Sequence, residues 1–81
     1  MWYVYFLELS NGDIYVGSTG DLKARLEAHS SGRVVSTRGY RPMKLRSYVA
    51  VESELRARKL ELYFKSGSGK AVAIKRFLND G

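Results

Sequence analysis

The first seventeen residues carry the pattern of a β-hairpin. Residues 2–9 (WYVYFLEL) are aromatic, branched or aliphatic apart from one glutamate, and residues 13–17 (DIYVG) repeat this composition. Asn11 and Gly12 lie between the two segments. Strands favour aromatic and β-branched residues, and Asn-Gly is typical of hairpin turns. The pattern therefore predicts two antiparallel strands joined by a tight turn.

Two registers of this hairpin are compatible with the turn residues. One has a two-residue Asn11-Gly12 loop, and the other has a type I turn over residues 9–12 with Gly12 left-handed in a bulge. A slip of one residue moves every side chain of a strand to the other face. The bulged register collects apolar residues on one face (Trp2, Val4, Phe6, Ile14, Val16) and places Tyr3, Tyr5, Leu7, Tyr15 and Gly17 on the other. We therefore predict the bulged register, in which Tyr5 and Tyr15 are close and Gly17 leaves space beside them.

A helix is predicted over residues 19–32. Leu22, Leu26 and His29 follow the i, i+4, i+7 spacing of one helical face. Thr19 or Asp21 is expected to cap its start, and Gly32 to end it.

The second half of the chain predicts one more strand and two helices. In residues 44–52 apolar residues alternate at Leu45, Val49 and Val51, as in a strand. Ser53 is expected to cap a helix that runs to about Lys65 with an apolar stripe of Ala57, Leu60 and Phe64. SGSG (66–69) is expected to break the chain before a last helix at 70–78, with a stripe of Ala71, Ile74 and Leu78. The prediction is a single α+β domain over residues 1–81, with order β-β-α-β-α-α and a three-stranded antiparallel sheet flanked by helices.

The composition narrows the classes of partner. The 81 residues include no cysteine, which excludes disulfides and thiolate zinc sites. The net charge is +6 and the pI is near 9.8, a balance that favours nucleic acid. No apolar run is long enough to span a membrane, and the N-terminus lacks the features of a signal peptide. We expect a cytoplasmic protein with no membrane partner.

The positive charge is concentrated in the middle of the chain. No acidic residue lies between Glu27 and Glu52, whereas five basic residues do: Arg33, Arg38, Arg41, Lys44 and Arg46. A small protein can carry a basic loop without function, but the clustering and the high pI together favour nucleic-acid binding.

Three polar residues occupy positions next to or within apolar stripes. Arg25 and His29 lie one turn apart on the first helix, and Glu61 lies within the stripe of the second. A carboxylate there needs a cation, a metal or hydrogen-bond donors. Each residue also has an ordinary interpretation: His29 as a helix-end histidine, Arg25 as a solvated arginine, and Glu61 as the i,i+4 partner of Lys65.

Neither glycine-rich segment is a nucleotide-binding loop. GSTGDL lacks the lysine and spacing of G-x-x-x-x-G-K-[ST], and KSGSGKA has Phe64 where the first glycine belongs. Ser68, Gly69 and Lys70 open the last predicted helix, whose N-terminus could still bind a backbone phosphate.

Taken in order, the motifs resemble one known family. YVY at 3–5, YVG at 15–17 and DLKARLEAH at 21–29 are similar to the GIY-YIG nuclease superfamily. ARKLELYFK resembles that family's metal-binding helix through Ala57, Glu61 and Lys65, and SGSGKAVAIKRF is similar to the end of its short, single-domain bacterial branch. The first triplet departs from the family pattern by being Tyr-Val-Tyr. Tyr40 is the only candidate for a further histidine or tyrosine found in many relatives. The asparagine that several branches have near the last helix has no clear equivalent, because Asn79 lies almost at the terminus.

The resemblance implies a phosphodiester-cleaving site built from Tyr5, Tyr15, Arg25, His29 and Glu61. It implies that Glu61 holds one Mg²⁺ or Mn²⁺, that Arg25 clamps the scissile phosphate, and that Tyr15 is the general base or relays its proton. Tyr5 and His29 would assist by positioning water or accepting the relayed proton. Expected contacts to nucleic acid are Gly17, Arg38, Arg41, Lys65 and Lys70.

The sequence therefore predicts a metal-dependent endonuclease that cleaves DNA with structure selectivity or weak sequence specificity. The alternative on the same fold is a catalytically inactive nucleic-acid-binding module. A third interpretation, a protein-interaction domain with exposed tyrosines, is opposed by the basic loop. We also expect that such a small nuclease obtains its specificity from homodimerisation or from a protein partner.

Overall fold

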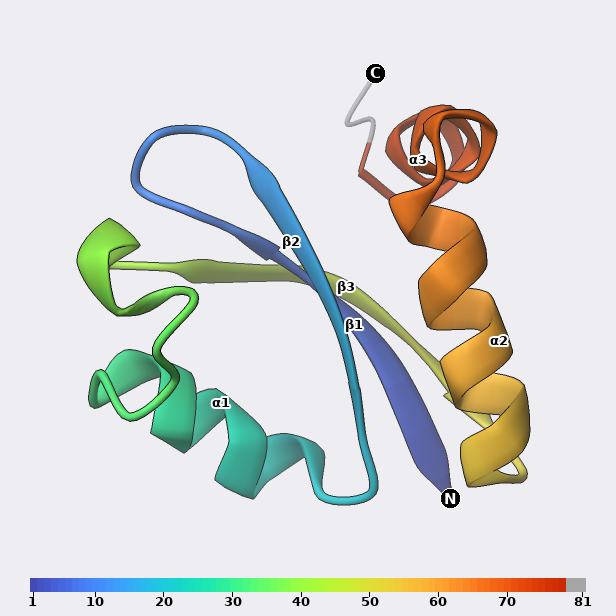
Figure 1. Cartoon of the computed structure of the whole chain (residues 1–81), viewed down its shortest axis with the longest axis horizontal. Coiled ribbons are helices and arrows are strands. Elements are labelled where there is room, and N and C mark those ends of the chain that lie inside the picture. The colour runs from blue at the N-terminus through green and yellow to red at the C-terminus, as the bar shows by residue number, and fades with distance from the viewer. Residues whose placement is uncertain (79–81) are drawn as a thin grey trace.

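The computed structural model describes residues 1–78 and forms a three-stranded sheet between two layers of helix (Figure 1). The elements are β1 (Trp2–Glu8), β2 (Ile14–Thr19), α1 (Leu22–Ser30), the 3₁₀ turn η1 (Arg38–Tyr40), β3 (Lys44–Val51), α2 (Glu54–Lys65), α3 (Gly67–Ala73) and the π-helical turn η2 (Ile74–Leu78). The sheet is antiparallel with β1 in the centre, in the order β2-β1-β3. The predicted α+β class and the order β-β-α-β-α-α are confirmed.

The β1–β2 hairpin has the bulged register. The Gly12 amide donates to the Leu9 carbonyl and the Leu9 amide donates to the Asp13 carbonyl, at 2.9 and 2.8 Å. Gly12 has a φ of 89°, a left-handed conformation that suits glycine. Tyr5 pairs with Gly17 across the ladder. The sorting of apolar residues thus predicted the register correctly.

β3 pairs with β1, but the pairing contains a bulge. Phe6 pairs with Ser47 and Leu7 with Leu45, so one extra β3 residue lies between the two pairs. The expectation that Leu45 continues the apolar alternation of Val49 and Val51 is wrong. The bulge turns Leu45 to the face of Leu7, where it lines a cavity beside α1, while Val49 and Val51 pack against the core.

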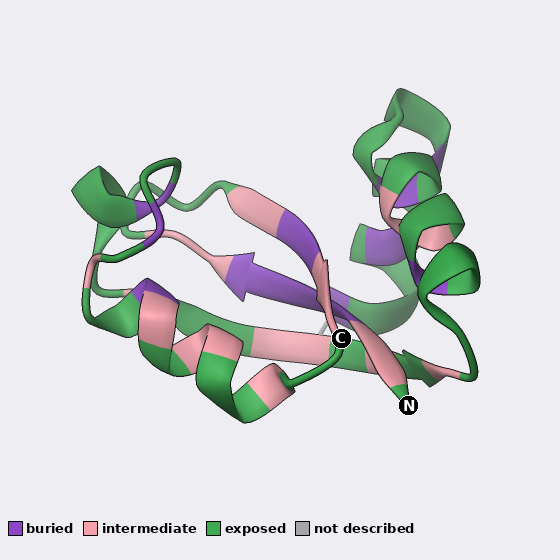
Figure 2. Cartoon of the chain, turned by 60° about the horizontal axis from the view of Figure 1, so that its bottom comes forward, coloured by how far each residue is buried: buried purple, intermediate pink, exposed green. Residues whose placement is uncertain are grey.

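The core lies between the sheet and α2, α3 and η2. Its buried members come from the predicted apolar face of the hairpin and from the helices (Val4, Phe6, Val16, Ala57, Phe64, Ala73 and Leu78). Phe6 contacts Phe64 edge to face, with ring centroids 5.2 Å apart. Ser53 caps α2 by accepting from the Arg56 amide, as predicted. Figure 2 shows the buried residues along β1 and on the inner sides of the helices.

The last helix begins earlier than predicted. Ser66 caps it by accepting from the Gly69 amide, and α3 starts at Gly67, so SGSG opens the helix where a break was expected. A Cβ on Gly69 would overlap the Tyr63 carbonyl, so glycine allows α3 to fold back closely on α2.

The buried stripe of this last segment also differs from the prediction. Ala71 and Ile74 are exposed, whereas Gly69, Ala73 and Leu78 are buried. The five-residue step from Ala73 to Leu78 matches the π-helical turn, which shifts the stripe away from a 3.6-residue period. Asn79 lies outside the described residues.

α1 packs on the opposite face of the sheet. Asp21 caps it by accepting from the Ala24 amide, and Gly32, with a φ of 80°, follows its end. His29 is the one buried residue of this helix, while Leu22 and Leu26 are half-buried. Within residues 1–78, no helix is both long and apolar enough to cross a membrane.

Candidate active site

Tyr5 is at the centre of a polar cluster on the α1 face of the sheet. Its side chain is fully buried, and its hydroxyl lies 2.9 Å from His29 Nε2 and 3.4 Å from Arg25 Nε. Burial raises the pKa of Tyr5 above its ordinary value of 10.0, although the hydrogen bond from Arg25 acts in the opposite direction. Tyr5 is therefore a neutral phenol at physiological pH.

Gly17 provides the space for this phenol. It is the ladder partner of Tyr5, and a Cβ on Gly17 would overlap the hydroxyl oxygen and the ring carbon that bears it. The glycine of the second triplet and the final tyrosine of the first triplet are thus one packing unit.

His29 lies on α1 with both ring nitrogens engaged. Nε2 contacts the Tyr5 hydroxyl, and Nδ1 lies 2.8 Å from the Thr37 hydroxyl oxygen. Burial and the nearby charge of Arg25 lower the pKa of His29 below its ordinary value of 6.5. The imidazole is therefore neutral at pH 7 and able to accept a proton.

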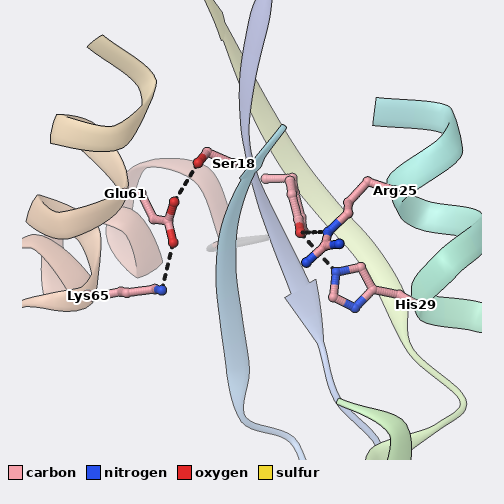
Figure 3. A network of polar contacts seen from close by, with 6 residues as sticks. Ser18, Arg25, His29, Glu61 and Lys65 are labelled. Carbon is pink, nitrogen blue, oxygen red and sulfur yellow. Dashed lines mark hydrogen bonds and ion pairs between the residues drawn. The ribbon is translucent and has the colours of Figure 1, made fainter. Parts of the chain in front are cut away.

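Arg25 lies one turn before His29 and reaches the same hydroxyl (Figure 3). The hydrogen bond to Tyr5 raises the pKa of Arg25, so the guanidinium is charged at every accessible pH. A fixed cation beside Tyr5 stabilises negative charge on the phenol oxygen or on a phosphate bound there.

Tyr15 connects this cluster to the second helix. Its ring centroid lies 6.4 Å from that of Tyr5 and 5.2 Å from that of His29. Lys65 Nζ, from α2, lies 5.9 Å from the same ring centroid. Unlike Tyr5, Tyr15 is only half-buried, so solvent can reach it.

Glu61 lies on α2, on the other side of β2 from Arg25 and His29 (Figure 3). One carboxylate oxygen accepts from the Ser18 hydroxyl at 2.5 Å, and the other from Lys65 Nζ at 2.7 Å. Burial alone would raise the pKa of Glu61, but the hydrogen bonds from Lys65 and Ser18 outweigh it, and the pKa is lowered below 4.5. Glu61 is therefore an ionised, oriented carboxylate in a half-buried position.

Glu61 is the side chain of the site that could hold a magnesium ion, as a single protein ligand. Within residues 1–78, no group of three or more His, Cys, Asp and Glu side chains lies together. Mg²⁺ retains several waters and often binds proteins through one or two carboxylates plus substrate phosphates. The ionised Glu61 carboxylate, whose partner Lys65 lies 5.9 Å from the Tyr15 ring centroid, has the donor chemistry for such a site.

The five residues predicted to contact nucleic acid have different surroundings in the structure. Gly17 packs against Tyr5, and Lys65 pairs with Glu61. Arg38 on η1 and Lys70 on α3 are exposed. The Arg41 guanidinium donates to the carbonyls of Ser30 and Arg38, and so ties the basic loop to the C-terminus of α1.

Two residues that contact the site were not predicted from the sequence. Ser18 orients Glu61, and Thr37 contacts His29; neither belongs to a motif, and their partners are 43 and 8 residues away. The alternation of β2 could have placed Ser18 toward α2, but the loop after α1 gives no periodicity from which to find Thr37. Tyr40, the predicted candidate in that loop, accepts through its carbonyl from the Ser10 amide.

Comparisons with known proteins agree with this arrangement. The family model for the GIY-YIG catalytic domain matches residues 1–75. The UPF0213 protein SAG0778 of Streptococcus agalactiae serotype V is 37% identical over 81 residues, covering 96% of this chain and 92% of that protein. The UPF0213 protein Reut_B5558 of Cupriavidus pinatubonensis is 38% identical over 65 residues, covering 79% and 72%.

A solved structure is also similar. The solution NMR structure of the UPF0213 protein BH0048 from Bacillus halodurans superimposes with a TM-score of 0.59 at 34% sequence identity, covering 93% of this chain and 84% of that one. The family model spans both tyrosine triplets, α1 and the glutamate of α2, which are the elements that build the site. The chain therefore belongs to the family of GIY-YIG catalytic domains, a nuclease family.

Proposed function

We propose that this protein is a metal-dependent endonuclease that hydrolyses phosphodiester bonds of DNA. The observation that carries the proposal is the position of Tyr15. Its accessible ring lies between the Tyr5–His29–Arg25 cluster and the Glu61–Lys65 pair. For hydrolysis by water, a general base, a phosphate clamp and a metal ligand must meet at one phosphate, and Tyr15, Arg25 and Glu61 are the side chains proposed for these three roles.

Tyr15 is the proposed general base or proton relay for the attacking water. A general base must reach the proton that it removes, and Tyr15 is the tyrosine of the pair that solvent reaches. Tyr5 is buried against Gly17, with its hydroxyl on neutral His29. The Tyr5–His29 pair is therefore proposed to take up the proton that the water loses.

Arg25 and Glu61 are proposed to stabilise the negative charge on the scissile phosphate and the leaving oxygen, Arg25 directly and Glu61 through a metal ion. The Arg25 guanidinium holds a non-bridging oxygen of the scissile phosphate, a geometry that suits its planar donors. Glu61, oriented by Ser18, would hold Mg²⁺ or Mn²⁺, which neutralises charge on the phosphate and the leaving oxygen when bound. Lys65, which pairs with Glu61 at 2.7 Å in this structure, is proposed to contact a phosphate oxygen when a metal occupies the carboxylate.

The basic side chains of the protein support a nucleic-acid substrate that is bound through its phosphate backbone. The net charge is +6, and exposed Arg33 and Arg38 lie in the loop after α1. Contacts from such side chains to phosphates position a protein on nucleic acid but carry no direct sequence information. We therefore infer structure-selective or weakly sequence-specific cleavage.

The test is the nicking of supercoiled and branched DNA at low salt with Mg²⁺, Mn²⁺ or EDTA. Wild type, Glu61→Ala and Glu54→Ala are compared. Glu54 is the matched control, because it lies on the same helix and pairs with Arg58 at the same i,i+4 spacing. We expect metal-dependent cleavage by wild type and the control, and a loss of at least about 100-fold in Glu61→Ala. Equal cleavage by all three proteins would exclude Glu61 as the metal ligand.

One contact favours the second candidate, an inactive nucleic-acid-binding module. The Glu61 carboxylate is paired with Lys65, which neutralises its charge in the absence of metal. If no metal supports cleavage while DNA is still retained, this second function replaces the first.

A further inference from the structure

Thr37 is a buried polar residue in the loop between α1 and η1. Its side chain is fully buried, and its hydroxyl oxygen lies 2.8 Å from His29 Nδ1. It also lies 3.5 Å from the Val34 carbonyl, to which it can donate. Within residues 1–78, no buried side-chain polar atom lacks a hydrogen-bond partner. The directions of these hydrogen bonds can therefore be worked out from the donors and acceptors present.

The Tyr5 hydroxyl determines the first direction. Its two hydrogen-bond partners are Arg25 Nε and His29 Nε2. Arginine donates and never accepts, so the hydroxyl hydrogen of Tyr5 has His29 Nε2 as its acceptor. Nε2 must then carry a lone pair and no hydrogen.

The Thr37 hydroxyl completes the chain. Because the neutral imidazole carries one hydrogen, a bare Nε2 requires the hydrogen on Nδ1. Nδ1 then donates to the Thr37 oxygen, and the Thr37 hydroxyl donates to the Val34 carbonyl. The opposite tautomer would point Nε2–H at the Tyr5 oxygen, which would leave the buried Tyr5 hydrogen without either of these two partners as an acceptor.

We propose that Thr37 is a positioning residue that holds His29 in the Nδ1–H tautomer, so that Nε2 can receive the proton of Tyr5. The tautomer is inferred only from the hydrogen-bond geometry of Tyr5, His29 and Thr37, whereas its catalytic consequence rests on the nuclease function proposed above. In turnover the O–H bond of Tyr5 breaks and an N–H bond forms at His29 Nε2, which leaves imidazolium and the Tyr5 phenolate. The phenolate is stabilised by Arg25 until it takes up, by way of Tyr15, the proton that the attacking water loses. Tyr5 is then a neutral phenol again, the water has become the attacking hydroxide, and the proton is held on His29.

The tautomer can be read directly because His29 is the only histidine of the chain. Protein labelled with ¹⁵N-histidine gives one pair of ring nitrogens, and long-range ¹H–¹⁵N correlation identifies which one carries the hydrogen. At pH 8 we expect Nδ1–H in wild type, Nδ1–H in Thr37→Ser, and a shift toward Nε2–H in the isosteric Thr37→Val. Wild type with Nε2–H, or Thr37→Val with an unchanged tautomer, would overturn the proposal.

The catalytic consequence is tested on the same three proteins by DNA cleavage with saturating metal. We expect Thr37→Val to lower kcat on the order of ten- to a hundredfold with little change in KM, since general acid–base groups contribute about 10²–10⁴-fold. Thr37→Ser should recover most of the rate. A shifted tautomer with wild-type kcat in Thr37→Val would overturn the catalytic role.

The two measurements also separate this proposal from the nuclease function. If wild type cleaves no DNA under any condition, the nuclease function fails, while the NMR result still decides the tautomer. Thermal unfolding of each variant shows whether the altered residue has changed the fold, and the wild-type spectrum alone can refute the tautomer if Thr37→Val does not fold.

Discussion

The Tyr5 hydroxyl occupies the space that a Cβ on Gly17, its partner across the β1–β2 ladder, would need. The two signature triplets therefore meet as one contact, in which glycine leaves the volume that a phenol occupies. This contact holds the Tyr5 oxygen where Arg25 and His29 can both reach it.

Gly17→Ala should destabilise the protein and displace Tyr5. The added methyl group overlaps the phenol, and overpacking of this kind costs about 1–3 kcal/mol. Urea unfolding measures the loss. Gly39→Ala is the matched control, because nothing lies within 4 Å of its added Cβ and its φ is not positive; we expect a change below about 0.5 kcal/mol. Combining Gly17→Ala with Tyr5→Phe should recover part of the stability, because the hydroxyl is the nearest overlapping atom.

Ser18→Ala should weaken metal binding without removing the ligand. The Ser18 hydroxyl donates to one Glu61 oxygen, and loss of a group that orients a metal ligand typically costs about 10–100-fold in metal affinity. The measurement is the Mg²⁺ concentration that gives half-maximal cleavage. We expect this concentration to rise while the rate at saturating Mg²⁺ stays within about threefold. An unchanged Mg²⁺ dependence would show that Ser18 does not position the metal ligand.

The stability of the protein should fall as the pH drops below 6.5. Burial and Arg25 lower the pKa of His29 in the folded state, so the unfolded chain binds a proton at higher pH than the folded chain does. Above pH 6.5 both states are neutral at His29 and the free energy of unfolding is level. Below it the free energy falls by at most about 1.4 kcal/mol per pH unit until the folded pKa is reached.

Urea unfolding between pH 8 and 5.5 checks this dependence, and His29→Gln should flatten it. Glu61 acts in a separate window, because its lowered pKa removes stability only as the pH falls below 4.5. A wild-type profile that is flat or rises on acidification would contradict the buried neutral imidazole.

Arg38→Ala and Arg41→Ala should have different effects, although both arginines lie in the basic loop. Arg41 donates to the Ser30 and Arg38 carbonyls, so Arg41→Ala should lower the free energy of unfolding by about 1 kcal/mol. Arg38 is exposed on η1, and Arg38→Ala should instead weaken DNA binding and lower the slope of log K against log salt by about 1. Fluorescence anisotropy at several salt concentrations measures the slope. Equal effects of both variants on stability and on slope would refute the distinction.

Local patterns in the sequence determined much of the fold. The period-2 sorting of aromatic and branched residues set the hairpin register, because only the bulged register buries a continuous apolar face. The cap residues Asp21 and Ser53 determined where α1 and α2 begin. The motif residues Tyr5, Tyr15, Arg25, His29 and Glu61 were all identified from spacing and family resemblance.

Only the tertiary structure decided the β3 bulge, the start of α3 and the hydrogen-bond partners of the site residues. The β3 bulge moved Leu45 to the other face, and the close packing of Gly69 on α2 let a helix start where SGSG predicts a break. The contacts of Ser18 with Glu61 and of Thr37 with His29 join residues whose local sequence shows no periodicity or motif that pairs them. Short-range preferences fix elements and registers, whereas the partners of buried polar groups are fixed by which elements pack together, and that information is not local.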